Sequence, residues 1–133
     1  MISEILTLPK IEDPRGNLSV VERDIIPFAI KRMYYLYDVP SGAERGGHAH
    51  KAQKELIIAV SGSFDVVLND GKMEKIFSLN MPNQGLFVAT KTWRKLRNFS
   101  SGAVCLVVSS GEYEEEDYIR NYDDFIKFLE FEI

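Results

Sequence analysis

Short β-rich runs separated by turn signals recur along most of the chain, and they constrain the fold more than any other feature. Eight such runs read NLSVVE, AIKRMYYLYDV, ELIIAV, SFDVVLN, KMEKIFSL, GLFVAT, WRKLRNF and AVCLVVSS. Strands at this close spacing are typical of a sandwich or barrel rather than of βαβ units. Asp70-Gly71 between two of the runs predicts a hairpin, because this pair supports the positive φ angles of a tight turn. We therefore expect one all-β domain over residues 1–133.

Only the C-terminal tail departs from the strand pattern. From Asp117 onward, aromatic and aliphatic side chains recur at helical spacing, namely Tyr118, Tyr122, Phe125, Ile126 and Leu129. This spacing predicts a short amphipathic helix that packs on the β domain or on a partner subunit. The acidic run from Glu112 to Asp117 is expected to be a solvated segment that complements the positive end of this helix.

Composition and charge argue against several classes of partner. The net charge of −4 gives no electrostatic reason to expect nucleic acid or an anionic membrane. No apolar run approaches the roughly 18 residues of a membrane helix, and MISEILTLPK lacks the pattern of a secretory signal, so we expect a cytoplasmic protein. The single Cys105 lies in an apolar run and is expected to pack in the core.

The residues with the clearest chemical potential lie in GAERGGHAHKAQKELIIAVSG, which contains both histidines of the chain. Residues two apart in a strand point to the same face, so His48 and His50 are predicted to enter one cavity together. Gly46 and Gly47 before them let the backbone turn or approach a ligand closely. Two imidazoles with Glu55 nearby suit either a metal site or acid–base chemistry.

The spacing of this stretch resembles the first signature of the cupin superfamily, with fitting residues at Gly42, His48, His50, Glu55 and Gly62. The resemblance implies a double-stranded β-helix, the cupin jelly roll, here followed by a short C-terminal helix. Metal-binding cupins add a histidine from a second signature, and in ATKTWRKLRN that place is taken by Arg94. A guanidinium is permanently protonated and cannot ligate a metal. We therefore expect no metal and no other cofactor, and the histidine pair with Glu55 leaves a weak metal site as the alternative.

A closer resemblance covers essentially the whole chain. The segments IEDPRGNLSVVE, KRMYYLYDVPSGAERGGHAHKAQKE and EDYIRNYDDF are similar to those of the cupin 3,4-ketoisomerases of dTDP-sugar pathways, the WxcM-like group. The resemblance implies metal-free conversion of dTDP-4-keto-6-deoxyglucose to a dTDP-3-keto-6-deoxyhexose, the substrate of a later aminotransferase. Arg94 and Glu55 depart from the family pattern, which often has His and Gln there. The resemblance also implies a homodimer, and the apolar run ISEILTL suits a strand exchanged between subunits.

Moving a carbonyl from C4 to C3 requires a base for the C3 proton, an acid for C4 and a group that stabilises the enediolate between them. His48 and His50 are the predicted acid–base pair, with the base left open between them. Alternation in AIKRMYYLYDV puts Arg32 and Tyr34 on one face, which we predict to be the cavity face, with Tyr34 catalytic. The predicted substrate-binding residues are Arg15, Gly16, Arg32, Arg45, Trp93, Arg94 and Arg120.

Three functions stay open at this point. The ketoisomerase is favoured because the resemblance runs through several separate segments. A related 3,5-epimerase-like enzyme would use a similar histidine base on the same scaffold, and a metal-dependent cupin or a sugar sensor is the third alternative. Structural roles also stay open for Arg15 in a turn, Trp93 in the core and Arg120 in an ion pair. Within the resemblance, Arg15-Gly16 favours the galacto form of the product.

Overall fold

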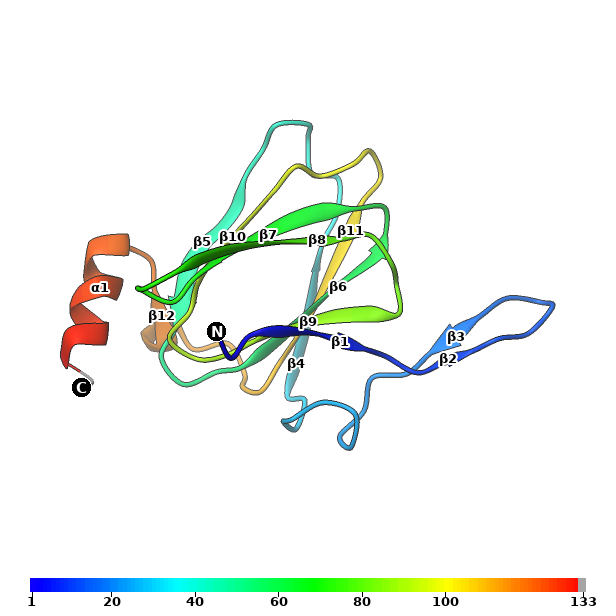
Figure 1. Cartoon of the computed structure of the whole chain (residues 1–133), viewed down its shortest axis with the longest axis horizontal. Helices are drawn as coiled ribbons and strands as arrows, with labels where there is room; N and C mark the ends of the chain where they lie inside the picture. The colour runs from blue at the N-terminus through cyan, green and yellow to red at the C-terminus, as the bar shows by residue number, and fades with distance from the viewer. Residues whose placement is uncertain (132–133) are drawn as a thin grey trace.

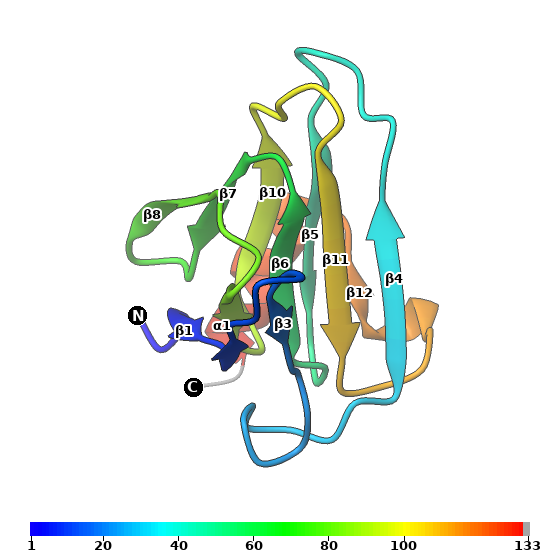
Figure 2. The ribbon, with the colours of Figure 1, turned by 90° about the vertical axis from the view of Figure 1, so that its right-hand side faces the viewer.

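The computed structural model describes residues 1–131, which form two facing five-stranded antiparallel sheets (Figures 1 and 2). The first sheet has the order β1-β9-β6-β11-β4 and the second has the order β12-β5-β10-β7-β8, and β2 pairs with β3 in a separate ribbon. The all-β fold with a short C-terminal helix predicted from the sequence is confirmed. The strands are β1 (Glu4–Thr7), β2 (Lys10–Ile11), β3 (Leu18–Ser19), β4 (Arg32–Leu36), β5 (Arg45–His50), β6 (Glu55–Ser61), β7 (Phe64–Asn69), β8 (Glu74–Leu79), β9 (Gln84–Val88), β10 (Trp93–Arg97), β11 (Val104–Ser109) and β12 (Tyr118–Ile119).

The central strand β6 is buried on both of its faces, which explains its unbroken apolar sequence. Ile57 packs in the main core between the two sheets, and Leu56 and Ile58 pack in a second cluster outside the first sheet with Leu8 and Ile26. Complete burial of each such side chain stabilises the fold by about 1.5–3 kcal/mol. Because β6 is covered on both sides, its first residue, Glu55, is also fully buried.

The hairpin predicted around Asp70-Gly71 is present between β7 and β8. Asn69 pairs with Glu74, so the connection is four residues long and only Gly71 among them has a positive φ, 92°. Asp70 Oδ1 accepts backbone hydrogen bonds from Lys72 and Met73 at 2.9 and 3.0 Å. A two-residue turn of this kind would need positive φ angles at two positions. The longer connection needs only one, and the side-chain hydrogen bonds of Asp70 stabilise it.

The C-terminal helix, α1 (Tyr122–Phe131), begins later than its sequence spacing suggested. Tyr118, expected on the helix, instead belongs to β12, which pairs with β5, and a 3-10 turn, η1 (Glu115–Asp117), precedes it. Asn121 sets the start of α1, because its Oδ1 accepts the backbone N–H of Asp124 at 3.1 Å. Phe125 is fully buried, so the helix packs on the β domain of its own chain as Figure 1 shows.

The N-terminal segment forms an edge strand and then leaves the body of the molecule. β1 pairs with β9 of its own chain, and the β2–β3 ribbon projects outward (Figure 1). Ile11 and Leu18 on the ribbon are 57% and 55% exposed. An isolated two-stranded ribbon is marginally stable in water, and the two exposed apolar side chains add no packing against the body of this chain.

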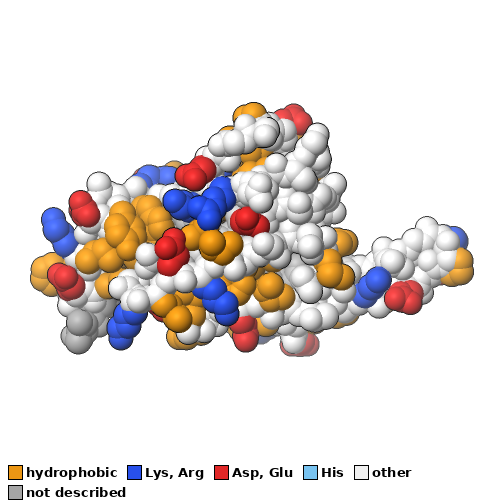
Figure 3. Space-filling model, turned by 45° about the horizontal axis from the view of Figure 1, so that its top comes forward, with side chains coloured by type: hydrophobic (Ala, Val, Ile, Leu, Met, Phe, Trp, Pro, Cys, Tyr) orange, Lys and Arg blue, Asp and Glu red, His pale blue; other side chains and the backbone are white. Residues whose placement is uncertain are grey.

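The surface carries no large area of a single charge sign on the face shown in Figure 3, where basic and acidic side chains are interspersed with hydrophobic ones. Among residues 1–131 no helix is long and apolar enough to cross a membrane. Cys105 is fully buried in the core, as expected, and burial raises the pKa of its thiol to about 12.

Candidate active site

A cavity of about 340 Å³ opens between the two sheets. The first sheet contributes Tyr34 from β4 and Glu55 from β6, and the second contributes His48 from β5 and Arg94 from β10. Arg45 and Arg120 also line it and are exposed. Of the residues predicted from the sequence, the structure thus brings Tyr34, Arg45, His48, Arg94 and Arg120 to one cavity.

A local distortion of β5 fixes the orientation of the His48 imidazole. Gly46 and Gly47 have φ angles of 103° and 35°, and the pairing of β5 with β10 is irregular at this point. The Gly46 carbonyl lies 2.5 Å from His48 Nδ1. A carbonyl only accepts, so Nδ1 carries the proton and Nε2 has a free lone pair; Nε2 has no hydrogen-bond partner among the described residues.

Burial and the charge of Arg94 lower the pKa of His48 to about 3, with the Gly46 carbonyl acting in the opposite direction. The ring is therefore unprotonated at Nε2 at neutral pH. A buried, unpartnered lone pair beside a cavity is the state required of a general base.

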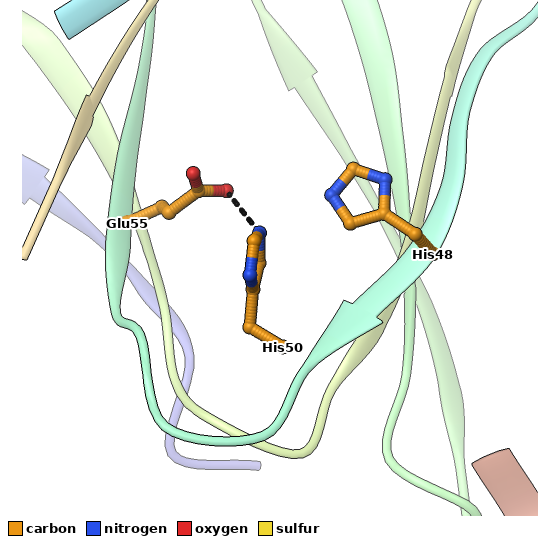
Figure 4. A group of neighbouring side chains, drawn as sticks. All are labelled: His48, His50 and Glu55. Atoms are coloured by element: carbon orange, nitrogen blue, oxygen red, sulfur yellow. Dashed lines mark ion pairs between the residues drawn. The ribbon is translucent and has the colours of Figure 1, made fainter. Parts of the chain in front are cut away.

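His50 lies behind the cavity wall and is completely buried. Its Nδ1 is 2.8 Å from Asp117 Oδ2. Its Nε2 is 3.4 Å from Glu55 Oε1, a contact that the dashed line in Figure 4 marks. The ring packs edge-on against His48, with centroids 5.0 Å apart, and lies against the tilted ring of Tyr118 with centroids 4.4 Å apart. The two histidines are neighbours, as predicted, but only His48 lines the cavity.

Glu55 is the centre of the charged groups in the site. Its Oε1 accepts a hydrogen bond from Arg94 Nη1 at 2.6 Å, and its Oε2 accepts one from the Tyr34 hydroxyl at 2.9 Å. Burial alone would raise the pKa of Glu55, but the neighbouring imidazole of His50 and the charge of Arg94 outweigh it and lower the pKa to about 2. Glu55 is therefore a carboxylate at neutral pH.

Tyr34 keeps its proton strongly. Burial is the largest cause that raises the pKa of its hydroxyl, and the negative charge of Glu55 raises it further. The structure thus sets a protonated phenol and a neutral imidazole on different walls of one cavity. Different protonation states in neighbouring groups are the mark of an acid–base pair.

Two further residues of the site were missed by sequence reasoning. The side chain of Asp117 is 9% exposed and binds His50, although it was expected in a solvated acidic run. Gln53 is buried; its Oε1 accepts hydrogen bonds from Arg32 Nη2 at 3.0 Å and from Ser109 Oγ at 2.8 Å. The spacing of the histidine motif gives no signal for either residue, because the partners of both lie far away in the sequence.

Several predicted residues lie outside the cavity. Trp93 packs against Tyr122 and Phe125 beside α1, with ring centroids 5.4 and 5.8 Å apart, because it points to the opposite side of β10 from Arg94. Arg15 pairs with Asp13 at the end of the ribbon and its side chain is 90% exposed; Gly16 follows it in the same turn.

Two arginines near the cavity have internal partners. Arg32 faces the predicted side of β4 but stops behind the wall, where it hydrogen-bonds Gln53 and lies 3.8 Å from Glu55 Oε2. Arg120 at the cavity mouth donates to both carboxylate oxygens of Glu115 at 2.7 and 2.9 Å and stacks 4.3 Å from the Tyr118 ring centroid. The ion pair proposed as its structural role is therefore present.

His48, His50 and Glu55 are also the described residues that could hold a metal ion, since their ligating atoms lie within 4.8 Å of one another. Two imidazoles and a carboxylate fit a divalent cation in donor type. However, Arg94 already binds the Glu55 oxygen at 2.6 Å, and its fixed positive charge opposes a second cation there. The donor set therefore suits a guanidinium-neutralised carboxylate better than a metal centre.

Comparisons with known proteins agree with this geometry. Residues 1–130 match the model of the FdtA family, described as WxcM-like, C-terminal. The chain is 39% identical over 130 residues to a TDP-4-oxo-6-deoxy-α-D-glucose-3,4-oxoisomerase from Aneurinibacillus thermoaerophilus, covering 97% of this chain and 94% of that protein.

Solved structures of similar chains are also sugar 3,4-ketoisomerases. One from Helicobacter canadensis is 45% identical with a TM-score of 0.95, covering 98% of each chain. QdtA from Thermoanaerobacterium thermosaccharolyticum, solved with TDP, is 38% identical with a TM-score of 0.95, covering 100% and 99%. A TDP-quinovose 3,4-ketoisomerase from Campylobacter jejuni is 44% identical with a TM-score of 0.91, covering 95% and 98%.

More distant structures share only the fold. A dTDP-4-dehydrorhamnose 3,5-epimerase from Bacillus anthracis is 15% identical with a TM-score of 0.78, covering 88% of this chain and 77% of the other. The fold therefore does not separate the two reaction classes, whereas the family match over residues 1–130 does. The chain belongs to the FdtA (WxcM-like) family, and the similar proteins described above are named as 3,4-ketoisomerases or, for the Aneurinibacillus protein, as a TDP-sugar 3,4-oxoisomerase.

Proposed function

We propose that this protein moves the keto group of TDP-4-keto-6-deoxyglucose from C4 to C3. The observation that carries the proposal is one cavity with a neutral His48, a protonated Tyr34 and a buried Arg94. QdtA has been solved with this same keto sugar in a variant in which a histidine is replaced by asparagine. The relatives therefore supply the substrate class, and the cavity supplies the groups that its isomerisation needs.

The reaction follows from the protonation states of these groups. His48 Nε2 removes the C3 proton, the C3–H electron pair forms a C3–C4 double bond, and the C4 carbonyl oxygen becomes negative. The charge of Arg94 stabilises this enediolate. The proton of the C3 hydroxyl passes to the C4 oxygen, and Tyr34 then donates its proton to C4 as the C3 carbonyl forms. Afterwards His48 loses its proton to solvent and Tyr34 regains one.

The cavity is small enough to define which part of the substrate enters it. A volume of about 340 Å³ is at the lower end of ligand pockets, so we expect it to hold the hexose while the nucleoside lies outside. Arg45 and Arg120 line the mouth, where guanidinium groups can bind diphosphate oxygens in pairs. Arg120 would exchange its bond to Glu115 for the diphosphate on binding.

We propose the gluco configuration at C4 of the product. The galacto form, which the sequence favours through Arg15-Gly16, is the alternative, and it requires Arg15 to reach the cavity from a second copy of the chain. Tyr34 and His48 come from facing sheets, so they approach a bound sugar from different sides. In the gluco product the new C4 hydrogen is on the ring face opposite to the C3 hydrogen that was removed. The 44% identity to a TDP-quinovose enzyme supports the same assignment.

We propose a homodimer in which the β2–β3 ribbon packs on a second copy. Ile11 and Leu18 give the ribbon an exposed apolar surface, and packing against another chain would bury it. In that arrangement Arg15 can reach the partner's cavity, which would restore its predicted role in substrate binding. A cytoplasmic location stays a prediction from the sequence.

A single experiment tests the proposed reaction. The protein is incubated with TDP-4-keto-6-deoxyglucose in deuterated water, and the ring protons are followed by NMR, with His48→Asn as the control. Loss of the C3 proton signal together with a new C3 carbonyl supports the proposal, and a large H4–H5 coupling supports the gluco product. Deuterium at C3 and C5 without carbonyl migration would instead identify an epimerase.

A further inference from the structure

Asp117 is a carboxylate, 9% exposed, that contacts the site from behind and does not line the cavity. Its Oδ1 accepts the backbone N–H of Ala52 at 2.7 Å, and its Oδ2 accepts the backbone N–H of Gln53 at 3.3 Å. Oδ2 also lies 2.8 Å from His50 Nδ1. Backbone donors fix both oxygens, so the carboxylate cannot rotate away from the imidazole.

The segment that carries Asp117 is anchored just as firmly. Its backbone carbonyl accepts the N–H of Lys51 at 2.9 Å, and the next residue, Tyr118, pairs with His50 in the β12–β5 ladder. The position of Asp117 is thus coupled to the strand that carries His50. A carboxylate held this way serves to orient the histidine, because several bonds specify its place.

Asp117 fixes the orientation of the His50 ring. A carboxylate only accepts, so His50 Nδ1 carries a proton and Nε2 is directed at Glu55 Oε1, 3.4 Å away. The groups that face the ring are Asp117, Glu55, His48 and Tyr118. Glu55 in turn accepts the hydroxyl of Tyr34 at 2.9 Å. These contacts form one continuous line from Asp117 through His50 and Glu55 to a cavity-lining hydroxyl.

We propose that Asp117 is a positioning residue: it fixes His50 against Glu55, and Glu55 in turn fixes the hydroxyl of Tyr34 for proton transfer to C4. The inference rests on the proposed ketoisomerase function. After each turnover Tyr34 regains its proton from solvent through the cavity that it lines. His48 takes part only in the C3 step, so the two halves of the reaction depend on different residues.

The test separates those two halves. In Asp117→Asn the side chain keeps its size, but an amide has one acceptor oxygen where the carboxylate has two, so it cannot serve Ala52, Gln53 and His50 together. We expect carbonyl migration to fall about 10- to 100-fold, as for a disturbed acid–base group, while deuterium exchange at C3 stays within about threefold of wild type. Glu116→Gln is the matched control, because it removes one charge from the exposed neighbouring residue of the same turn.

A second comparison shows whether Asp117 acts through His50. In a His50→Asn background, adding Asp117→Asn should cause no further loss of migration, since coupled residues are not additive. The proposal would be overturned if the double variant lost migration by the product of the two single effects. It would also be overturned if Asp117→Asn lost C3 exchange and migration to the same extent. Thermal unfolding identifies a misfolded variant, for which Asp117→Glu replaces Asp117→Asn in the same two assays. If the wild type does not isomerise the sugar, the proposed function fails instead.

Discussion

Replacing Arg94 by methionine should destabilise the protein most strongly at neutral pH. Arg94 is 1% exposed and its Nη1 lies 2.6 Å from Glu55 Oε1 in an equally buried ion pair. Arg94→Met keeps most of the side-chain volume and removes the charge. Glu55 would then be a buried carboxylate without its guanidinium partner, and breaking a buried pair in this way typically costs about 3–5 kcal/mol.

The pKa of Glu55 gives an independent estimate of the size of this effect. In the folded protein it is lowered from an ordinary value of 4.5 to about 2. At about 1.4 kcal/mol for each pKa unit, that difference corresponds to about 3 kcal/mol of stability. A lowered folded pKa means that this contribution is complete above about pH 4.5 and is lost as the pH falls towards 2. His50 still faces Glu55 in the variant, so we expect a loss near 3 kcal/mol rather than 5.

In Arg94→Met the contribution of Glu55 to stability is smaller at neutral pH. Without the guanidinium the folded pKa of Glu55 rises, while His50 and Tyr34 still favour the carboxylate, so the wild type loses more stability than the variant as the pH falls towards 2. The free energy of unfolding, measured by urea denaturation, should therefore differ from wild type by about 3 kcal/mol at pH 7.5 and by clearly less near pH 3. Lys95→Met, on the same strand, is the control and should change stability by less than about 0.5 kcal/mol.

Two outcomes would refute this reasoning. One is a difference from wild type that is equal at both pH values, or larger at the lower one. The other comes from Glu55→Gln: in the Arg94→Met background it should restore stability, because it removes the unpaired charge while still accepting the Tyr34 hydroxyl. A double variant as unstable as Arg94→Met alone would show that the lost energy is packing and not charge.

Four further predictions concern activity and assembly. His48→Asn and His50→Asn should each fold and lower isomerisation by at least about 10²-fold, with C3 exchange lost only in His48→Asn; near wild-type turnover of either variant in the NMR assay would exclude that residue. Because the pKa of His48 is lowered to about 3, the base is unprotonated above that value, and the acid limb of kcat/KM should lie well below pH 6; a limb near 6.5 would contradict the assignment. Activity should survive prolonged chelation, and finding about one metal per chain whose removal abolishes activity would favour a metal centre. Deleting residues 1–8, the run that the sequence predicts as a strand exchanged between subunits, should convert the expected dimer into inactive monomer or aggregate, which light scattering measures; a stable and active monomer, from the intact or the shortened chain, would refute the dimer.

Local sequence rules predicted the strands and which side of β4 is buried. Alternation placed Tyr34 inward, where it reaches Glu55, and placed Tyr35 outward, where it is 57% exposed. The same alternation, applied to β10, excludes Trp93 from the cavity. Trp93 and Arg94 are adjacent in β10, so both cannot face the cavity, and the ion pair with Glu55 shows that Arg94 does.

The helix boundary illustrates a limit of local patterns. Tyr118 shares the helical spacing of α1, but it pairs with His50 in β12 because β5 offers an open edge there. Strand pairing across such a separation depends on which edges the rest of the fold leaves free, and periodicity carries no information about those edges. The spacing therefore predicted the helix correctly, but the pairing of Tyr118 with His50 makes the helix begin later, at Tyr122.

The burial of Asp117 depends on the same long-range pairing. Five acidic residues lie between Glu112 and Asp117, and in sequence each of them is typical of a solvated segment. Only the last meets backbone donors at Ala52 and Gln53 and the ring of His50, which lies 67 residues earlier in the chain. Those donors offset the cost of burying its charge. A substitution of Glu116 should therefore leave the reaction unchanged. A substitution of Asp117, the next residue, should lower the rate of carbonyl migration, because Asp117 orients the core histidine His50.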